Sequence, residues 1–230
     1  MSTALFDPIK TMSKITDSVI VGLSTGKESV VVLDLCCKYF KRVVAYHLHI
    51  CPNLQFTERT LRWYENKYGI EVLRLPHPDV CEYFHYGSFR PGDPTFPIMS
   101  FNEVYHHMRV ETGIFWIAGG ERAKDSLFRL GLLNTAGSID ENRGRFYPLA
   151  QWNKKEVLAY IKKNRLKLGD DSKVLGSSFW GLHGKCLIQI KQHFPDDYER
   201  LLKLYPFAEA GVKREEERLA KGDKYYTKEY

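Results

Sequence analysis

Apolar runs alternate with helix-like stretches over the first third of the chain. Three short apolar runs, Val19–Leu23, Arg42–Ile50 and Ile70–Leu75, are typical of buried parallel strands. The stretches between them, Glu28–Phe40 and Phe56–Tyr68, predict helices, the second with apolar residues three to four positions apart. This alternation predicts an α/β fold, a three-layer sandwich with a mostly parallel central sheet in a Rossmann-like arrangement.

Capping residues mark the expected ends of the helices. Thr57 is the expected N-cap of the helix over 56–68, and Gly69 is expected to end it. Asn153 is the expected cap of a further helix, Lys154–Asn164. These polar and glycine residues stand where helices typically begin and end, so they support the predicted boundaries.

The regular alternation stops after the third strand. Residues 76–100 hold five prolines and several aromatic residues, so we expect a long functional loop or lid there. A helix over Phe101–Glu111 and a fourth strand over Ile114–Ala118 follow. We expect residues 1–190 to form one α/β domain and residues 191–230 to form a C-terminal helical extension.

Composition and charge exclude several classes of protein. The chain of 230 residues has a net charge of +6, but no cluster of five basic residues, so charge alone does not predict a nucleic-acid partner. The sequence contains no run of 18 apolar residues, so no membrane span is predicted, and residues 1–14 lack the apolar core of a signal peptide. We therefore expect a cytoplasmic protein with no membrane partner.

Cysteine and histidine spacing indicates no metal centre. The five cysteines include no Cys-x-x-Cys pair, so we expect neither a zinc ribbon nor an iron–sulfur cluster. His47 and His49 alternate on one strand and do not form a metal-binding set with other histidines. A Mg²⁺ ion held mainly by nucleotide phosphates would need few protein ligands and is compatible with the sequence.

The segment Ser24–Ser29 carries the strongest chemical signal. It joins a predicted strand to a predicted helix, and backbone N–H groups at such a junction bind anions. Gly26 lets the backbone approach a ligand closely, and Lys27 adds a positive charge. The segment therefore predicts a site for a phosphate-bearing ligand at the carboxyl edge of the sheet.

Three motifs resemble those of a known family. Ser24–Ser29 resembles the PP-loop, Ser-Gly-Gly-Lys-Asp-Ser, of the adenine nucleotide alpha-hydrolase-like superfamily, with Thr25 in place of Gly and Glu28 in place of Asp. Gly120–Ser126 resembles the Gly-x-Arg-x-x-Glu-Ser motif of the phosphoadenosine phosphosulfate (PAPS) reductase family. Tyr147–Ile161 resembles the Pro-Leu-x-x-Trp-Thr-x-x-Asp-Val-x-x-Tyr-Ile segment of the same family.

The resemblance implies an adenine-nucleotide enzyme. The ligand would be ATP or PAPS, and the implied reaction adenylylates an unknown acceptor with release of pyrophosphate. Lys27 and Arg122 are then the catalytic candidates. The nucleotide-binding candidates are Ser24, Thr25, Gly26, Lys27, Glu28, Ser29, His49, Gly120, Arg122, Ser126 and Arg129.

Two alternatives remain open on the sequence. Reductases of this family use a cysteine near the C-terminus, and Cys186 is the last cysteine here, so a PAPS reductase would need Cys186 and an external thiol. The second alternative is a non-catalytic nucleotide-binding module that supports a protein or nucleic-acid partner in nucleic-acid modification. Homo-oligomerisation is compatible with either alternative.

Overall fold

The computed structural model describes residues 3–222, and a mostly parallel sheet lies at its centre. Among these residues, six strands pair in the order β3-β2-β1-β4-β6-β5, and only the β5–β6 pair is antiparallel. The strands are β1 Ser18–Gly22, β2 Arg42–His49, β3 Val72–Pro76, β4 Ile117–Ala118, β5 Ile139–Asp140 and β6 Arg145–Phe146. The predicted α/β fold with a mostly parallel sheet is confirmed.

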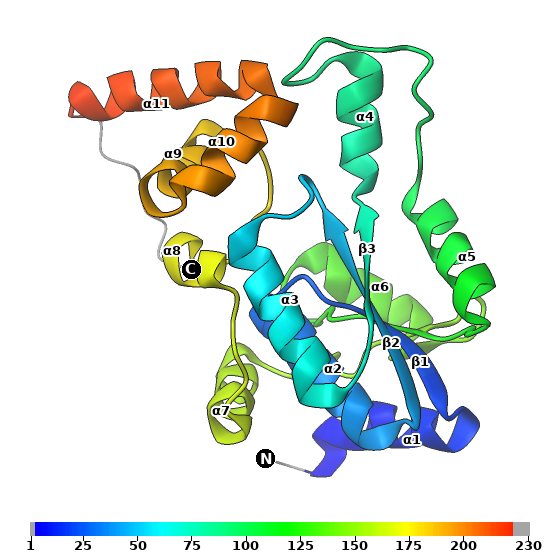
Figure 1. Cartoon of the computed structure of the whole chain (residues 1–230). Coiled ribbons are helices and arrows are strands. Elements are labelled where there is room, and N and C mark those ends of the chain that lie inside the picture. The colour runs from blue at the N-terminus through cyan, green and yellow to red at the C-terminus, as the bar shows by residue number, and fades with distance from the viewer. Residues whose placement is uncertain (1–2, 223–230) are drawn as a thin grey trace.

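Helices flank the sheet on both faces (Figure 1). The α-helices are α1 Asp7–Ile15, α2 Lys27–Tyr39, α3 Gln55–Tyr68, α4 Pro78–Tyr86, α5 Phe101–Thr112, α6 Leu127–Ala136, α7 Lys154–Asn164, α8 Asp170–Leu175, α9 Gly184–His193, α10 Pro195–Leu204 and α11 Glu209–Ala220. Two short 3₁₀ turns cover Thr3–Phe6 and Pro206–Ala208.

The alternating side chains of β1 define the layers. Val19 and Val21 pack in the largest core with α1, α2, α3 and α7. Ile20 points to the opposite face and packs with Val104 and Met108 of α5. Successive side chains of a strand point to opposite faces, so this apolar run has helices on both sides of it.

A buried carboxylate joins the helices of the first face. Asp34 of α2 accepts hydrogen bonds from the Tyr68 hydroxyl of α3 and, at 2.6 Å, from the Tyr160 hydroxyl of α7. Lys38 supplies the counter-charge at 2.6 Å. A carboxylate buried with several donors is satisfied, so it fixes how α2, α3 and α7 pack together.

The C-terminal helices form a second core beyond the strand ends. Leu187 and Ile190 of α9 pack with Leu201 of α10 and with Ile50 and Phe56, which flank the β2–α3 connection. Figure 1 shows α9, α10 and α11 together beside the tip of β2. The domain boundary expected at residue 190 therefore falls inside α9. Of the extension expected over 191–230, residues 223–230 lie outside the described part of the chain.

Two local expectations are wrong. The segment 76–100 is not a loop throughout, because Pro78–Tyr86 forms α4. Pro78 stands in its first turn, where a missing N–H costs nothing, and the His77 side chain accepts from the Asp79 N–H at 3.2 Å. Thr57 is not the cap of α3, because that helix begins at Gln55 and its N-cap position is Leu54.

The amides at the start of α3 are satisfied by a distant residue. The Asp197 carboxylate of α10 accepts from the Gln55 N–H at 2.8 Å and from the Phe56 N–H at 3.1 Å. A carboxylate at this end also matches the positive pole of the helix. The C-terminal helices therefore hold the connection that follows β2.

Candidate functional site

The 24–29 loop joins the end of β1 to the first turn of α2. Ser24 Oγ donates to Ser29 Oγ at 3.2 Å, and Ser29 Oγ donates to the Gly26 carbonyl at 3.0 Å. Gly26 is the N-cap of α2 and has no side chain to cap the helix, and Ser24 Oγ accepts from the Gly26 N–H at 3.4 Å. The first N–H groups of α2 and its positive pole are therefore left for an anion, as the sequence predicts.

Thr25 is a buried residue of this loop with an unusual backbone conformation. Its φ of 63° lies in the left-handed region, which is strained for a β-branched residue, and its side chain is fully buried. Its carbonyl accepts from the Gly169 N–H at 3.1 Å. Thr25 was expected among the nucleotide-binding residues, but its buried side chain does not line the cleft described below.

A row of ion pairs links the loop to the turn after β4. Glu28 Oε1 lies 3.5 Å from Lys27 Nζ and 2.9 Å from Arg122 Nη2. Asp125 pairs with Arg122 and, at 2.8 Å, with Arg129. Arg122 is only 6% exposed, so it is no ordinary surface arginine. Three cations face two carboxylates, and the row keeps one net positive charge near the loop.

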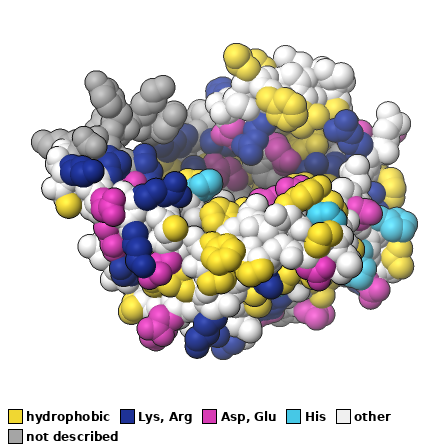
Figure 2. All heavy atoms as spheres, turned by 90° about the horizontal axis from the view of Figure 1, so that it is seen from above, with side chains coloured by type: hydrophobic (Ala, Val, Ile, Leu, Met, Phe, Trp, Pro, Cys, Tyr) yellow, Lys and Arg dark blue, Asp and Glu magenta, His cyan; other side chains and the backbone are white. Residues whose placement is uncertain are grey.

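These groups line a cleft of about 750 Å³ at the carboxyl ends of β1, β2 and β4. Seen from above, Lys, Arg, Asp and Glu side chains gather in this hollow (Figure 2). Its volume suits a small-molecule ligand. The sequence-predicted residues that line it are Ser24, Gly26, Lys27, Glu28, Ser29, Gly120, Arg122 and Arg129.

Gly120, Ser126 and His49 have different positions. A Cβ on Gly120 would lie 3.3 Å from the Glu28 Cβ, so glycine allows this turn to approach α2 closely. Ser126 caps α6 by accepting from the Arg129 N–H at 3.2 Å and does not line the cleft. His49 lines a smaller neighbouring cavity, here called the side chamber, and not the cleft.

The side chamber measures about 30 Å³, room for one or two small polar atoms. His47 borders both spaces, and its Nδ1 donates to the Leu23 carbonyl at 2.8 Å, leaving Nε2 as an acceptor. Burial lowers the pKa of His47 to about 4, so the ring is neutral at pH 7. His49 Nδ1 is buried without a partner among the described residues.

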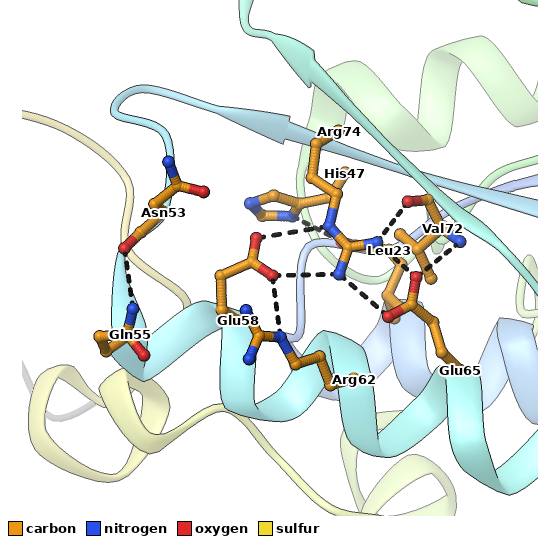
Figure 3. Close-up of polar contacts among 9 residues, drawn as sticks. All are labelled: Leu23, His47, Asn53, Gln55, Glu58, Arg62, Glu65, Val72 and Arg74. Atoms are coloured by element: carbon orange, nitrogen blue, oxygen red, sulfur yellow. Dashed lines mark hydrogen bonds and ion pairs between the residues drawn. The ribbon is translucent and has the colours of Figure 1, made fainter.

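An ion-pair cluster adjoins this chamber through Glu58 (Figure 3). Arg74 of β3 lies between two glutamates of α3, with Nη2 at 3.0 Å from both Glu58 Oε2 and Glu65 Oε2. Glu58 itself lines the chamber. Arg62 Nε lies 3.8 Å from Glu58 Oε2, so two cations face two carboxylates and the cluster is nearly neutral, in contrast to the cationic row near the 24–29 loop.

Asp171 and residues 176–180 are part of the site that sequence reasoning missed. Asp171 is 1% exposed, and its Oδ2 accepts from the Phe179 N–H at 2.6 Å. Burial raises the pKa of Asp171 to about 6. This bond places residues 176–180 along the cleft, where Ser178 Oγ would lie 3.3 Å from a Cβ on Gly26. No motif or periodicity marks this segment.

Four further residues line the cleft: Tyr46, Tyr105, Glu121 and Arg145. Glu121 follows β4 after the glycine turn, and Arg145 is the first residue of β6. Their signal in the sequence was proximity to the glycine turn and to the Tyr147–Ile161 motif. Tyr46 and Tyr105 carried no such signal, since each reads as an ordinary core position.

Cys186 does not line the cleft. It is 2% exposed in α9. Burial raises the pKa of the Cys186 thiol to about 12, so the thiol is protonated at pH 7. A nucleophilic cysteine needs a thiolate, and the catalytic role considered for Cys186 finds no support in this geometry.

Two features are absent from residues 3–222, the part of the chain that the structure describes. No three His, Cys, Asp or Glu side chains there gather as they would around a metal ion. None of the helices there combines the length and the apolar character needed to cross a membrane.

A family model matches most of the chain. The phosphoadenosine phosphosulfate reductase domain model matches residues 18–170, which include the 24–29 loop and the turn after β4. No curated protein matches the sequence.

Three solved structures of enzymes are similar. The U34-tRNA thiolase of Methanococcus maripaludis is 17% identical, with a TM-score of 0.49 over 94% of this chain and 79% of its own. The NH₃-dependent NAD synthetase of Campylobacter jejuni is 15% identical, with a TM-score of 0.45 over 92% and 91%. The PAPS reductase of Candida auris is 16% identical, with a TM-score of 0.48 over 76% and 93%.

One of these structures overturns an expectation. From its cysteine spacing the protein was expected to hold no iron–sulfur cluster, but the similar tRNA thiolase was solved with its 4Fe–4S cluster. That exclusion is therefore wrong.

Proposed function

Because this chain belongs to the phosphoadenosine phosphosulfate reductase domain family of the PP-loop superfamily, we propose that it is a nucleotide-binding enzyme. It binds ATP or a sulfonucleotide in the cleft. With ATP, it adenylylates an acceptor and releases pyrophosphate. The acceptor is a second molecule bound in the same cleft.

One observation carries the proposal. The uncapped start of α2, Lys27 and the buried Arg122 all border one cleft at the carboxyl edge of the sheet. Backbone N–H groups and a helix pole bind phosphate oxygens, and arginine and lysine add charge. An ordinary strand–helix junction would not need a buried arginine from a distant turn beside it.

The residues divide the chemical work. An acceptor oxygen attacks the α-phosphorus, the bond from that phosphorus to the bridging oxygen breaks, and pyrophosphate leaves with the electron pair. Lys27, Ser24, Ser29 and the loop amides stabilise the departing pyrophosphate. Arg122 neutralises charge that grows in the transition state, and such preorganised charges are a major source of catalysis.

Glu28 and Asp125 keep the cations in place when no anion is bound. Glu28 Oε1 lies within 3.5 Å of both Lys27 Nζ and Arg122 Nη2. A phosphate group that enters the loop replaces part of these contacts. The ion pairs therefore hold the cationic side chains toward the cleft, at some cost in binding energy because the old contacts weaken.

The reductase alternative is less well supported. A reductase needs a thiolate beside the sulfonucleotide, whereas the pKa of Cys186 is raised to about 12 by burial and the thiol does not line the cleft. The alternative of a non-catalytic module uses the same cleft, but it predicts that the nucleotide binds without turnover.

The test is pyrophosphate release from ATP over a panel of hydroxyl, carboxylate and amide acceptors. We expect release with at least one acceptor, reduced about 100-fold or more in Lys27→Ala and unchanged in the surface variant Lys41→Ala. Equal rates in Lys27→Ala and Lys41→Ala would exclude the proposed role of the loop. ATP binding without release on any acceptor would favour the non-catalytic module.

A parallel assay addresses the reductase. Sulfite formation from PAPS with reduced thioredoxin is measured for the unmodified protein and for Cys186→Ser. We expect no sulfite from either. Sulfite that disappears in Cys186→Ser would establish the reductase and refute adenylylation as the main activity.

A further inference from the structure

His47 takes no part in the proposed phosphate site, although it borders both the cleft and the side chamber. It lies near the carboxyl end of β2, in register with Arg74 of β3. Its ring Nδ1 donates to the carbonyl of Leu23 at 2.8 Å (Figure 3). Ser24, the next residue along the chain, begins the 24–29 loop. The imidazole is therefore anchored to the backbone one residue away from that loop.

The hydrogen bond to Leu23 determines which ring nitrogen of His47 is free. A carbonyl only accepts, so Nδ1 carries the proton of the neutral ring and Nε2 keeps a lone pair. Burial lowers the pKa of His47 to about 4, so this lone pair is present at pH 7. His47 therefore presents a proton acceptor to the cleft at neutral pH.

The second histidine of the cleft is held in the opposite tautomer. His77 Nδ1 accepts from the Asp79 N–H at 3.2 Å, so the proton of its neutral ring lies on Nε2. The nitrogen that His77 can offer to a ligand is therefore a donor. Of the two histidines that line the cleft, His47 is the one with a free lone pair.

The carboxylates of the cleft are paired with cations. Glu28 Oε1 lies 2.9 Å from Arg122 Nη2, and Glu121 Oε1 lies 2.8 Å from Arg145 Nη2. Asp125 also forms an ion pair with Arg122. A proton taken up by one of these carboxylates would cost an ion pair that holds an arginine in place. Among the described residues that line the cleft, these pairings leave one imidazole nitrogen as the free base.

We propose that His47 is the general base of the adenylylation reaction. This inference rests on the proposed function, because it assigns the proton that the acceptor loses. As the acceptor oxygen bonds to the α-phosphorus, its O–H bond breaks, the electron pair of that bond stays on the oxygen, and the proton moves to His47 Nε2. The bond from the phosphorus to the bridging oxygen breaks, and its electron pair leaves with pyrophosphate. The imidazolium then returns its proton to solvent through the cleft.

A bound nucleotide makes this base stronger. Burial is the largest cause of the lowered pKa of His47; the charges of His49 and Arg74 lower it further, and that of Glu58 raises it. A triphosphate on the 24–29 loop adds negative charge beside the ring, which favours the imidazolium. The attacking oxygen also becomes more acidic as its bond to phosphorus forms. The ring is therefore a sufficient base when both substrates are bound.

The test measures pyrophosphate release from ATP with an acceptor that supports it. His47→Asn keeps an N–H for the Leu23 carbonyl but has no base, so we expect kcat to fall about 100-fold or more. The KM for ATP should stay within about 3-fold, because the base acts in the transition state. His106→Asn is the matched control, because His106 is exposed on α5. An unchanged kcat in His47→Asn, or a loss confined to KM, would overturn the proposal.

Rescue by a soluble base separates catalysis from structure. His47→Ala removes the ring beside the cleft, and added imidazole can occupy its place. We expect imidazole to raise kcat of this variant by about 10-fold or more and to leave the parent protein unchanged. A structural defect would not respond to imidazole. Failure of imidazole to accelerate a His47→Ala variant that binds ATP would contradict the proposal.

The outcomes distinguish this inference from the proposed function. If the parent protein binds ATP but releases no pyrophosphate with any acceptor, the proposed adenylylation fails, and the role of His47 fails with it. If the parent releases pyrophosphate and His47→Asn is equally fast, the role of His47 alone fails. Calorimetric titration of ATP should give the parental affinity in both His47 variants. Loss of ATP binding in both would assign the ring to binding or folding and overturn the proposal.

Discussion

Removal of the Asp197 carboxylate should destabilise the protein through a helix on which Asp197 does not lie. Asp197 is 2% exposed and accepts two N–H groups at the start of α3, at 2.8 and 3.1 Å. Asp197→Ala leaves both donors without this acceptor, and an unsatisfied buried donor costs about 1–3 kcal/mol. Since water reaches part of the new space, we expect the free energy of unfolding to fall by about 2–4 kcal/mol.

Urea and thermal denaturation measure this loss. For a chain of this size, about 2–4 °C in Tm per kcal/mol gives a decrease of roughly 5–15 °C. Asp196→Ala is the matched control, because Asp196 stands in the same first turn of α10 but is exposed. Asp197→Asn keeps one acceptor oxygen and should lose about half as much. Equal stability of the Asp197→Ala and Asp196→Ala variants would refute the capping role.

Three further predictions concern the site and its supports. Arg129→Ala removes a half-exposed cation of the row and should weaken ATP binding about 3–10-fold by calorimetry, whereas the exposed Arg143→Ala should not. In Gly169→Ala the new Cβ would collide with the Asp171 carboxylate, so urea denaturation should show that the free energy of unfolding falls by about 1–3 kcal/mol. The control is Gly131→Ala in α6, where the new Cβ meets open space and stability should stay the same or rise. Similar losses of stability in both variants would contradict this account. The pKa of Asp171, raised to about 6, means that the folded protein holds this proton more firmly than the unfolded chain, so the group costs stability progressively from about pH 4 to pH 6. Asp171→Asn should therefore match the parent protein near pH 3.5 and exceed its stability by about 1–3 kcal/mol at pH 7, and a difference that does not grow with pH would refute the assignment.

Local sequence patterns were sufficient for the repeating part of the fold. The helix over Lys154–Asn164 begins and ends as predicted, because Asn153 and Glu156 form a capping box within a few residues. Gly69 ends α3 in the left-handed conformation, as its position predicts. Such signals are local, so a single sequence contains them.

Features made by distant partners could not be predicted in this way. The start of α3 is determined by Asp197, more than 100 residues away, and not by Thr57. Exposed Leu127 and Phe128 gave α6 no amphipathic pattern, so that helix was missed. The proline-rich segment concealed α4, since Pro78 is compatible with a first helical turn.

The residues of the candidate site also fall into those with a local sequence signal and those without one. The 24–29 loop and Arg122 were found from contiguous motifs. Asp171 became visible only when the chain was folded, because it borders the side chamber and its partner is the backbone N–H of Phe179. Cys186 shows the converse, since its place in the sequence favoured a catalytic role that the burial of its thiol does not support.

The most direct test of the account is calorimetric titration of ATP, pyrophosphate and adenosine into the parent protein, Lys27→Ala and Lys41→Ala. Lys27 lines the cleft, whereas Lys41 is 86% exposed and pairs with Asp17. A charge-assisted contact to phosphate contributes about 1.5–3 kcal/mol. The account predicts that ATP and pyrophosphate bind, that Lys27→Ala weakens both by about 10–100-fold, and that Lys41→Ala leaves both unchanged. Binding of ATP that is equally strong in Lys27→Ala, or binding of adenosine as tight as that of ATP, would contradict it.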